Sequence, residues 1–540
     1  MSKVFVFFLF LPFLSFGQAR YFVYLKDKSG AEGLTPGSFL SERSLQRRAV
    51  QNIALTEKDF PVTAAYLAEI REAGFRIIGK SKWLNAVLVE GDSSRTSILR
   101  SLSCVTRIED NADIRGDISL GQYARLRSKF DSPVIPVDYG ASATQIRMLG
   151  ADTMHANGYR GKGVLIAVMD AGFTRVNTAE AFAHLRNENK IRHTYNYVFE
   201  TPDVYRDDTH GTNVLSIIAG YLPGKLSGTA PEAELALYVT EDSRGENESK
   251  IEEVYWVLAA EHADSLGADV LNTSLGYYEF TDTSRNYTYP QMDGKTTIIA
   301  RGADYATRTG MIVVNSAGNE GNSAWRYVST PADAEYVIAV GAVNANRQKA
   351  SFSSFGPSAD GRVKPEVCAM GQTTVYSNTG ASVSAGNGTS YSGPLIAGFM
   401  AGLRQQFPTL TALQLREILI RSADRFTSPD NAYGYGIPGY SRAVQIAESD
   451  YGLVLRKEPD VTQILTYPNP LSSAQKLSIR IGDRVLPDTQ KITLTDNLGR
   501  VIRADIEKAR LNLRELENGL YHITLQYEGK RYSDKLILQK

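Results

Sequence analysis

The chain has 540 residues, of which 43% are hydrophobic and 22% are charged. These proportions are typical of a globular protein rather than a disordered or fibrous one, and the length predicts two or three folded domains. Lys and Arg together number 59, as do Asp and Glu, so the formal net charge is zero. No basic excess favours nucleic acid, and no nucleic-acid partner is expected.

Residues 1–17 have the pattern of a secretory signal peptide. Lys3 supplies a positive charge, residues 4–16 are almost wholly apolar, and the small residues Ser15 and Gly17 stand where a signal peptidase cuts. The apolar run is too short to cross a bilayer as a helix, and a buried N-terminal strand is the alternative interpretation. No later stretch is long and apolar enough for a transmembrane segment, so we expect an exported protein without one.

Residues 18–116 predict a small α+β domain. Strand patterns alternate with amphipathic helix patterns in the order strand-helix-strand-strand-helix-strand, at 20–25, 63–73, 75–78, 84–89, 93–102 and 105–108. This order is the split βαβ plan of ferredoxin-like folds. An inserted basic segment at 41–51 is interpreted as a solvated helix.

Residues 117–138 show no hydrophobic period and contain Pro133 and Pro136. We interpret them as an exposed linker, which is where proteolytic processing concentrates. Residues 139–450 repeat short, continuous apolar runs followed by amphipathic helix patterns. Strands that are apolar on both faces indicate an α/β domain with a parallel sheet sandwiched by helices.

Residues 464–540 change to alternating strand patterns separated by turn signals, which predicts a compact β-sandwich. This module has no convergent set of His, Asp or Cys residues. The two cysteines, Cys104 and Cys368, fall in different modules, so no disulfide scaffold is expected, and both are interpreted as small buried hydrophobic residues.

Three segments of the central domain carry chemically versatile side chains. Asp170 ends an apolar strand, at the sheet edge where open α/β domains place their sites, and His210 comes just before an apolar helix. Ser390 lies in a tight turn that opens another helix, where main-chain N–H groups favour a developing anion. Each segment alone has an ordinary structural interpretation as a cap, a turn or a structural histidine.

Together, the three segments in the order Asp, His, Ser resemble the signature regions of the subtilisin-like (subtilase, S8) serine peptidases. That order separates this family from the chymotrypsin-like and α/β-hydrolase triads. Residues 313–321, 337–343 and 350–356 follow the family's pattern as well, so the resemblance covers about 300 residues. The implied fold is subtilisin-like, and the implied activity is that of a serine endopeptidase acting on proteins or peptides.

The resemblance also implies roles for individual residues. Ser390 would attack the scissile carbonyl, His210 would take its proton, and Asp170 would orient the imidazole. Asn319 would hold the oxyanion with the Ser390 N–H. The edge segment that pairs with substrate backbone would be Ser274, Leu275 and Gly276.

Three positions depart from the family pattern. They are Asn213 where a second histidine is frequent, Ala171 after the aspartate, and Tyr391 after the serine. None removes a proton-transfer group. The chemistry requires no cofactor, and structural calcium, frequent in the family, has no matching ligand loop here, so metal ligands stay unassigned.

Each of the two flanking modules resembles a known type of domain. Residues 18–116 resemble the inhibitory propeptide of subtilases, which implies an intramolecular inhibitor that is later removed. Residues 464–540 resemble the C-terminal sorting domain of the type IX secretion system, with an Ig-like adhesive or carbohydrate-binding module as the alternative. The sorting interpretation implies passage through the periplasm to the surface or medium of a Gram-negative bacterium. The rival function for the whole chain is a catalytically silent subtilase fold that acts as a surface binding or adhesion protein.

Overall fold

The computed structural model describes residues 18–31, 33–110, 138–244, 248–378, 381–452, 462–472, 476–481, 484–496, 500–527 and 530–539. The proposed signal peptide and almost all of the proposed linker lie outside these residues. The chain divides into two compact units, one ending at Tyr451 and the other beginning at Gly452.

The first unit begins with an antiparallel four-stranded sheet in the order β2-β3-β1-β4. Its elements are β1 (Gln18–Leu25), α2 (Ala64–Glu72), β2 (Arg76–Ser81), β3 (Ala86–Asp92), α3 (Thr96–Ser101) and β4 (Val105–Asp110). Apolar side chains from the sheet and both helices form one core, which includes Val23, Ile70, Val87 and Leu99. The element order and the strand order are those of the predicted ferredoxin-like fold.

The predicted solvated helix at 41–51 is wrong in one respect, because the helix is buried by the central domain. α1 (Glu42–Val50) forms, but the side chains of Arg47 and Arg48 are only 2% and 3% exposed. Both pair with Asp264 on α8 (Ile251–Leu266), and Lys82 pairs with the same carboxylate at 2.8 Å. The acidic partner comes from a segment more than 200 residues away, which the local charge pattern cannot reveal.

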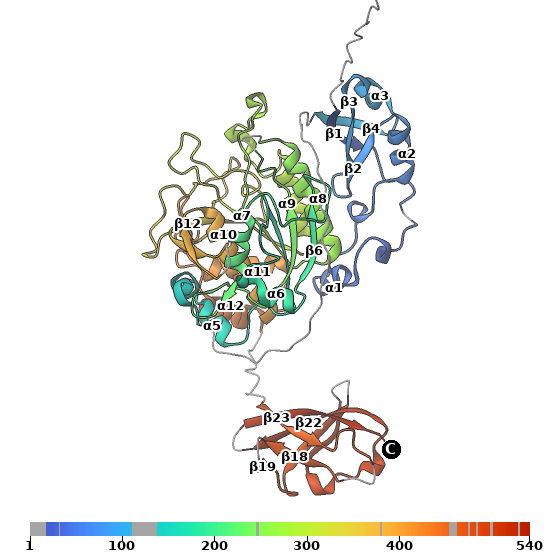
Figure 1. Ribbon diagram of the computed structural model, residues 1–540, viewed down its shortest axis with the longest axis vertical. Helices are drawn as coiled ribbons and strands as arrows, with labels where there is room; N and C mark the ends of the chain where they lie inside the picture. The colour runs from blue at the N-terminus through green and yellow to red at the C-terminus, as the bar shows by residue number, and fades with distance from the viewer. Residues whose placement is uncertain are drawn as a thin grey trace, which may run out of the picture. The chain divides into compact units, whose positions relative to one another are not determined.

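The end of α8 is shaped for this contact. Gly267 caps the helix at φ +94°, a conformation that favours glycine, and a Cβ there would lie 2.8 Å from the main-chain nitrogen of Ser44 in α1. Figure 1 shows the N-terminal domain, in blue, beside α8 and the neighbouring α9 (Ile298–Arg308).

The centre of the first unit is a seven-stranded parallel sheet in the order β13-β12-β11-β10-β5-β9-β6. Its strands are β5 (Leu165–Asp170), β6 (Ile191–Asn196), β9 (Glu234–Val239), β10 (Val270–Thr273), β11 (Ile312–Ser316), β12 (Ile338–Val343) and β13 (Val367–Met370). Every residue of β5, β10, β11 and β12 is buried, as the continuous apolar runs predict.

Helices flank this sheet. α7 (His210–Ala219) packs against α10 (Thr389–Gln406), and α8 packs against α9. The remaining elements are α4 (Ala143–Met148), α5 (Ala151–Ala156), α6 (Ala183–Asn187), α11 (Ala412–Ser422), α12 (Tyr440–Tyr451) and the short pairs β7 (Tyr221–Leu222) with β8 (Leu226–Ser227) and β14 (Thr374–Tyr376) with β15 (Ser384–Gly386). This is the α/β arrangement that the sequence predicts.

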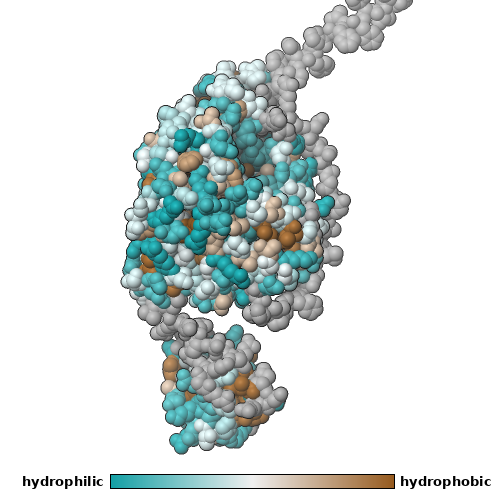
Figure 2. Space-filling view, turned by 90° about the vertical axis from the view of Figure 1, so that its left-hand side faces the viewer, coloured by the Kyte–Doolittle hydropathy of each residue, from teal (hydrophilic) through white to brown (hydrophobic). Residues whose placement is uncertain are grey.

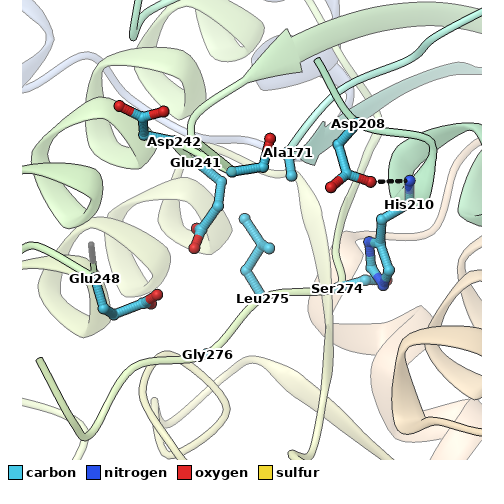
Figure 3. Close-up of a pocket in the computed structure, with 10 residues that line it drawn as sticks. Ala171, Asp208, His210, Glu241, Asp242, Glu248, Ser274, Leu275 and Gly276 are labelled. Carbon is cyan, nitrogen blue, oxygen red and sulfur yellow. Dashed lines mark hydrogen bonds between the residues drawn. The ribbon is translucent and has the colours of Figure 1, made fainter. Parts of the chain in front are cut away.

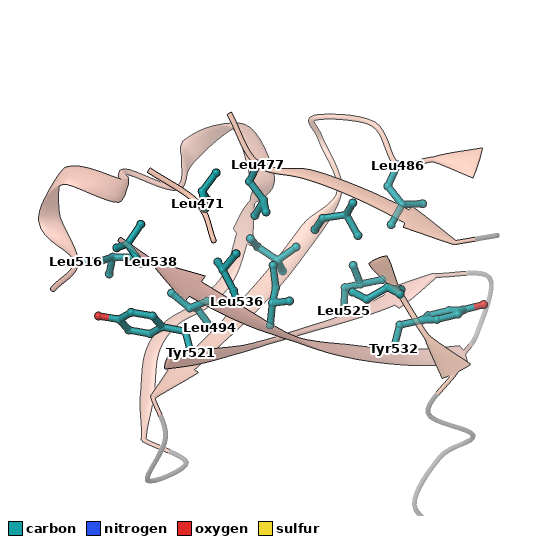
Figure 4. Packing of buried hydrophobic residues seen from close by; sticks show 14 residues of the cluster. Leu471, Leu477, Leu486, Leu494, Leu516, Tyr521, Leu525, Tyr532, Leu536 and Leu538 are labelled. Atoms are coloured by element: carbon teal, nitrogen blue, oxygen red, sulfur yellow. The ribbon is translucent and has the colours of Figure 1, made fainter. Parts of the chain in front are cut away.

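The second unit contains a five-stranded sheet, β16-β23-β22-β20-β21, and a three-stranded sheet, β17-β18-β19. The strands are β16 (Thr462–Gln463), β17 (Leu465–Tyr467), β18 (Ser478–Ile481), β19 (Arg484–Val485), β20 (Lys491–Asp496), β21 (Val501–Glu507), β22 (Gly519–Tyr527) and β23 (Lys530–Leu538). Buried apolar side chains of this unit, many of them leucines, form one core, which includes Leu477, Leu494 and Leu536 (Figure 4). This matches the predicted sandwich.

The polarity of the surface and the state of the two cysteines are as expected from the sequence. The face shown in Figure 2 is mostly hydrophilic, with hydrophobic residues in small groups. Within the described residues, no helix combines the length and the apolar character needed to cross a membrane. Cys104 and Cys368 are buried free thiols, as expected.

Candidate active site

Asp170 ends β5, in the interior of the parallel sheet, and its side chain is fully buried. Its Oδ1 accepts a hydrogen bond from the main-chain N–H of Ala171 at 2.8 Å. The residues before it are apolar and buried on both faces, so the strand places the carboxylate at its own carboxyl end, on the side of the sheet where such domains have their sites.

His210 is the first residue of α7 and lies directly against Asp170. The distance from its Nδ1 to Asp170 Oδ1 is 2.7 Å, and its main-chain N–H donates to Asp208 Oδ1 at 2.6 Å (Figure 3). Burial alone would favour the neutral imidazole, but the Asp170 carboxylate outweighs it and raises the pKa of His210 above its ordinary value. A buried carboxylate bound to Nδ1 also leaves Nε2 as the nitrogen that can accept a proton.

Ser390 is the second residue of α10. Its hydroxyl donates to the main-chain oxygen of Ser274 at 3.2 Å and not to His210. The Ser274 hydroxyl returns a bond to the main-chain oxygen of Ser390 at 3.1 Å. The structure therefore joins Asp170 to His210 and has the Ser390 hydroxyl bonded to Ser274; in many active sites the bond from serine to histidine forms only when substrate is bound.

Asn319 follows β11 and lies beside the start of α10. Its Oδ1 accepts from the main-chain N–H of Thr389 at 2.9 Å and from the Thr389 hydroxyl at 3.0 Å, which fixes the orientation of the amide. A Cβ on Gly388 would lie 3.7 Å from the Ser390 nitrogen and 3.9 Å from Asn319 Nδ2. Because residue 388 has no side chain, the space flanked by these two donors stays open for an oxygen.

Ser274, Leu275 and Gly276 follow β10 and line a cavity of about 580 Å³ together with His210. Asn315 Nδ2 donates to the Leu275 carbonyl oxygen at 3.1 Å, and this bond helps to fix the position of the segment. Gly276 packs closely, because a Cβ there would come within 2.2 Å of the Ser329 hydroxyl. The segment therefore forms one firm wall of the cavity next to the histidine.

Tyr391 is a site residue whose position the sequence did not reveal. Its ring stacks on His210, with centroids 6.4 Å apart and planes 26° apart, and on Tyr376 at 5.2 Å. The departure from the family pattern at this position was visible in the sequence. Its contact with the imidazole depends on the geometry of the first turn of α10.

An acidic cluster of Glu241, Glu248 and Glu252 also escaped the sequence analysis. One carboxylate oxygen from each of the three lies within 4.8 Å of the corresponding oxygens of the other two, and these residues could hold a metal ion. Burial, together with the Glu248 charge, raises the pKa of Glu252 to about 8. The sequence does contain a run of acidic residues from 241 to 253. It does not reveal that the fold places Glu241, which follows β9, beside the first turn of α8.

Three family models match separate parts of the chain. The subtilase family matches residues 161–436, the peptidase S8 propeptide domain of Bacteroidota matches 20–123, and the secretion system C-terminal sorting domain matches 465–539. The first match contains Asp170, His210, Asn319 and Ser390.

Curated relatives are similar over most of the chain. Subtilisin E of Bacillus subtilis (strain 168) and subtilisin NAT of Bacillus subtilis subsp. natto are each 30% identical over 383 residues, covering 70% of this chain and 85% of theirs. Subtilisin of Bacillus pumilus is 32% identical over 316 residues, covering 57% of this chain and 99% of its own.

Proposed function

The chain belongs to the subtilase family, and on that premise we propose that it is a serine endopeptidase that hydrolyses peptide bonds through an acyl-enzyme on Ser390. The observation that carries the proposal is the 2.7 Å bond between His210 Nδ1 and the fully buried Asp170. That bond orients an imidazole of raised pKa that lines the cavity.

In the acylation step, the Ser390 hydroxyl turns from the Ser274 carbonyl oxygen to His210 and attacks the scissile carbonyl carbon. His210 Nε2 takes the hydroxyl proton as the C–O bond forms, and Asp170 stabilises the resulting imidazolium. The same proton then passes to the leaving amine, the C–N bond breaks, and the acyl-enzyme remains. Water, deprotonated by His210, hydrolyses this ester and restores the serine.

The tetrahedral intermediate carries a negative oxygen that needs donors in place before the reaction. Asn319 Nδ2 and the Ser390 main-chain N–H flank the open space beside Gly388. Because Thr389 fixes the amide of Asn319, little reorganisation accompanies the appearance of the charge. The substrate backbone would lie along Ser274, Leu275 and Gly276 and add a strand to that segment.

The flanking modules fit a secreted peptidase. The sorting domain at 465–539 indicates a secreted or cell-surface protein, and residues 20–123 match a subtilase propeptide. We propose that the propeptide inhibits the enzyme until it is removed, and that the sorting domain delivers the chain to the type IX machinery from the periplasm.

Peptide cleavage by matched serine variants tests the proposed chemistry. We expect Ser390→Ala to abolish cleavage of an internally quenched peptide, while Ser392→Ala, two residues on in the same helix, retains it. The Ser392 hydroxyl is fully buried and bonds the main-chain oxygens of Thr389 at 2.9 Å and Val340 at 3.4 Å, so its loss should affect packing rather than proton transfer at Ser390. Equal activity of the wild type and Ser390→Ala would remove Ser390 as the nucleophile, and a folded wild type that cleaves nothing would favour the silent binding protein.

A further inference from the structure

The cavity beside His210 has two chemically different walls. His210, Ser274, Leu275 and Gly276 form the wall that the proposed mechanism uses. The other wall carries the acidic side chains Glu241, Asp242 and Glu248, and a fourth acid, Asp208, lies beside His210; no described Lys or Arg lines the cavity. Figure 3 shows the carboxylates of Glu241 and Glu248 turned toward each other, with Leu275 beside them.

Two of these acids already have partners. Asp208 accepts the main-chain N–H of His210 at 2.6 Å. Asp242 receives two bonds from the Arg244 guanidinium, both at 2.8 Å, and its carboxylate points away from the cavity in Figure 3. The acids with no Lys or Arg partner among the described residues are Glu241 and Glu248, together with Glu252, whose carboxyl group lies with theirs.

The hydrogen bonds that the described residues donate to the acidic cluster come from neutral groups. The Tyr277 hydroxyl donates to Glu241 at 2.7 Å, and the main-chain N–H groups of Asp242 and Ser249 donate to Glu252 at 2.8 and 3.0 Å. Lys250, the cation closest in sequence, lies over the Tyr287 ring at 4.1 Å instead. Three partly or fully buried carboxyl groups with no described cation beside them are costly to ionise together, and a bound positive group would favour their charged forms.

The last strand of the N-terminal domain ends near the acidic cluster. β4 ends at Asp110, and the carboxylate of the preceding Glu109 is close enough to act electrostatically on Lys250 and Tyr287. The described part of the N-terminal domain therefore ends near the first turn of α8, which carries Glu252 of the cluster.

The segment that follows in the sequence has the complementary chemistry. The proposed linker, residues 117–138, contains three basic residues, Arg125, Arg127 and Lys129. A guanidinium can bind carboxylates through two parallel hydrogen bonds, and an ammonium can bind several oxygens at once.

We infer that Glu241, Glu248 and Glu252 form a subsite that binds an arginine or lysine side chain of the substrate segment preceding the scissile bond. This inference rests on the proposed peptidase function. The chain's own linker at 117–138 would be the first substrate with this chemistry, and proteins with exposed basic segments would follow. A divalent cation is the competing occupant of the same three oxygens, and the test distinguishes the two.

The test measures kcat/KM on internally quenched peptides that carry Arg, Lys, Leu or Glu at each of the four positions before the cut. For the wild type, Arg or Lys at one position should exceed Leu by about tenfold or more, as expected for a charge-assisted hydrogen bond. Glu248→Gln should reduce that ratio by about tenfold, because it lowers kcat/KM on the Arg and Lys peptides more than on the Leu peptide. Glu248→Lys should reverse the preference toward Glu.

Asp282→Asn is the matched control, because Asp282 is exposed, pairs with Arg285 in its own loop, and should leave the ratio unchanged. A wild type that cleaves the library without preferring basic residues overturns the inference but not the peptidase function. A wild type that cleaves nothing and does not react with a fluorophosphonate overturns the function itself. Stoichiometric calcium binding that Glu248→Gln abolishes, combined with no basic preference in calcium, assigns the cluster to the cation and also overturns the inference.

Discussion

Asp264→Asn tests how the propeptide is held. The Asp264 carboxylate is fully buried and faces three cations of the N-terminal domain, Arg47, Arg48 and Lys82. Burial alone would raise the pKa of Asp264, but these cations hold it well below its usual range, so the carboxylate is charged at any pH near neutrality. Its contribution is lost only as the pH falls through that depressed pKa.

Removing one member of a buried ion pair destabilises a complex by about 3–5 kcal/mol. At about 1.4 kcal/mol for each tenfold change, propeptide affinity should fall by roughly 100-fold to several thousandfold. Arg48 keeps its bond to Asp59, and Lys82 keeps its bond to Ser265, so we expect the lower part of this range.

The assay dilutes freshly processed enzyme and follows the return of activity as the propeptide dissociates. For Asp264→Asn, activity should return at a protein concentration at least about 100-fold higher than for the wild type. Arg76→Gln is the control, because Arg76 contacts Glu200 but is 52% exposed, and such exposed pairs contribute under about 1 kcal/mol. The reasoning is refuted if both variants release the propeptide at similar concentrations.

Three further predictions concern the active site. Asn319→Ala should lower kcat by about 10²–10³ with KM nearly unchanged, since its amide stabilises the oxyanion more than the ground-state carbonyl; a loss confined to KM contradicts the assignment. Asp208→Asn should move the acid limb of the kcat/KM profile to lower pH, because Asp208 helps to raise the pKa of His210 and the base acts as neutral imidazole; an unmoved limb argues against this coupling. Ser390→Ala should accumulate as a chain that retains the propeptide in a host without other secreted proteases, detected by intact mass; normal maturation would show that another peptidase makes the cut.

The sequence was most informative where chemistry and local pattern coincide. The continuous apolar run before Asp170 predicts a buried parallel strand, and parallel strands present their carboxyl ends at one edge, so the place of the carboxylate could be inferred. The bond from His210 to Asp170 was likewise expected from the order of the motifs. Both follow from short-range rules joined to a family pattern.

Contacts between distant segments could not be predicted in this way. The basic face of α1 looked like a solvated surface, because its partner Asp264 is supplied by a helix of the central domain. The acidic cluster needed the loop after β9 to return onto α8. The rotamer of Ser390, which donates to Ser274, is a choice among side-chain wells that no sequence pattern specifies.

The most direct test of the central claim is to map the site of fluorophosphonate modification on the mature enzyme by peptide mass spectrometry. Activation by His210 makes one serine far more nucleophilic than the others. We predict a single adduct on Ser390, which His210→Ala abolishes. A folded enzyme that forms no adduct, or that carries it on another serine, would contradict the account.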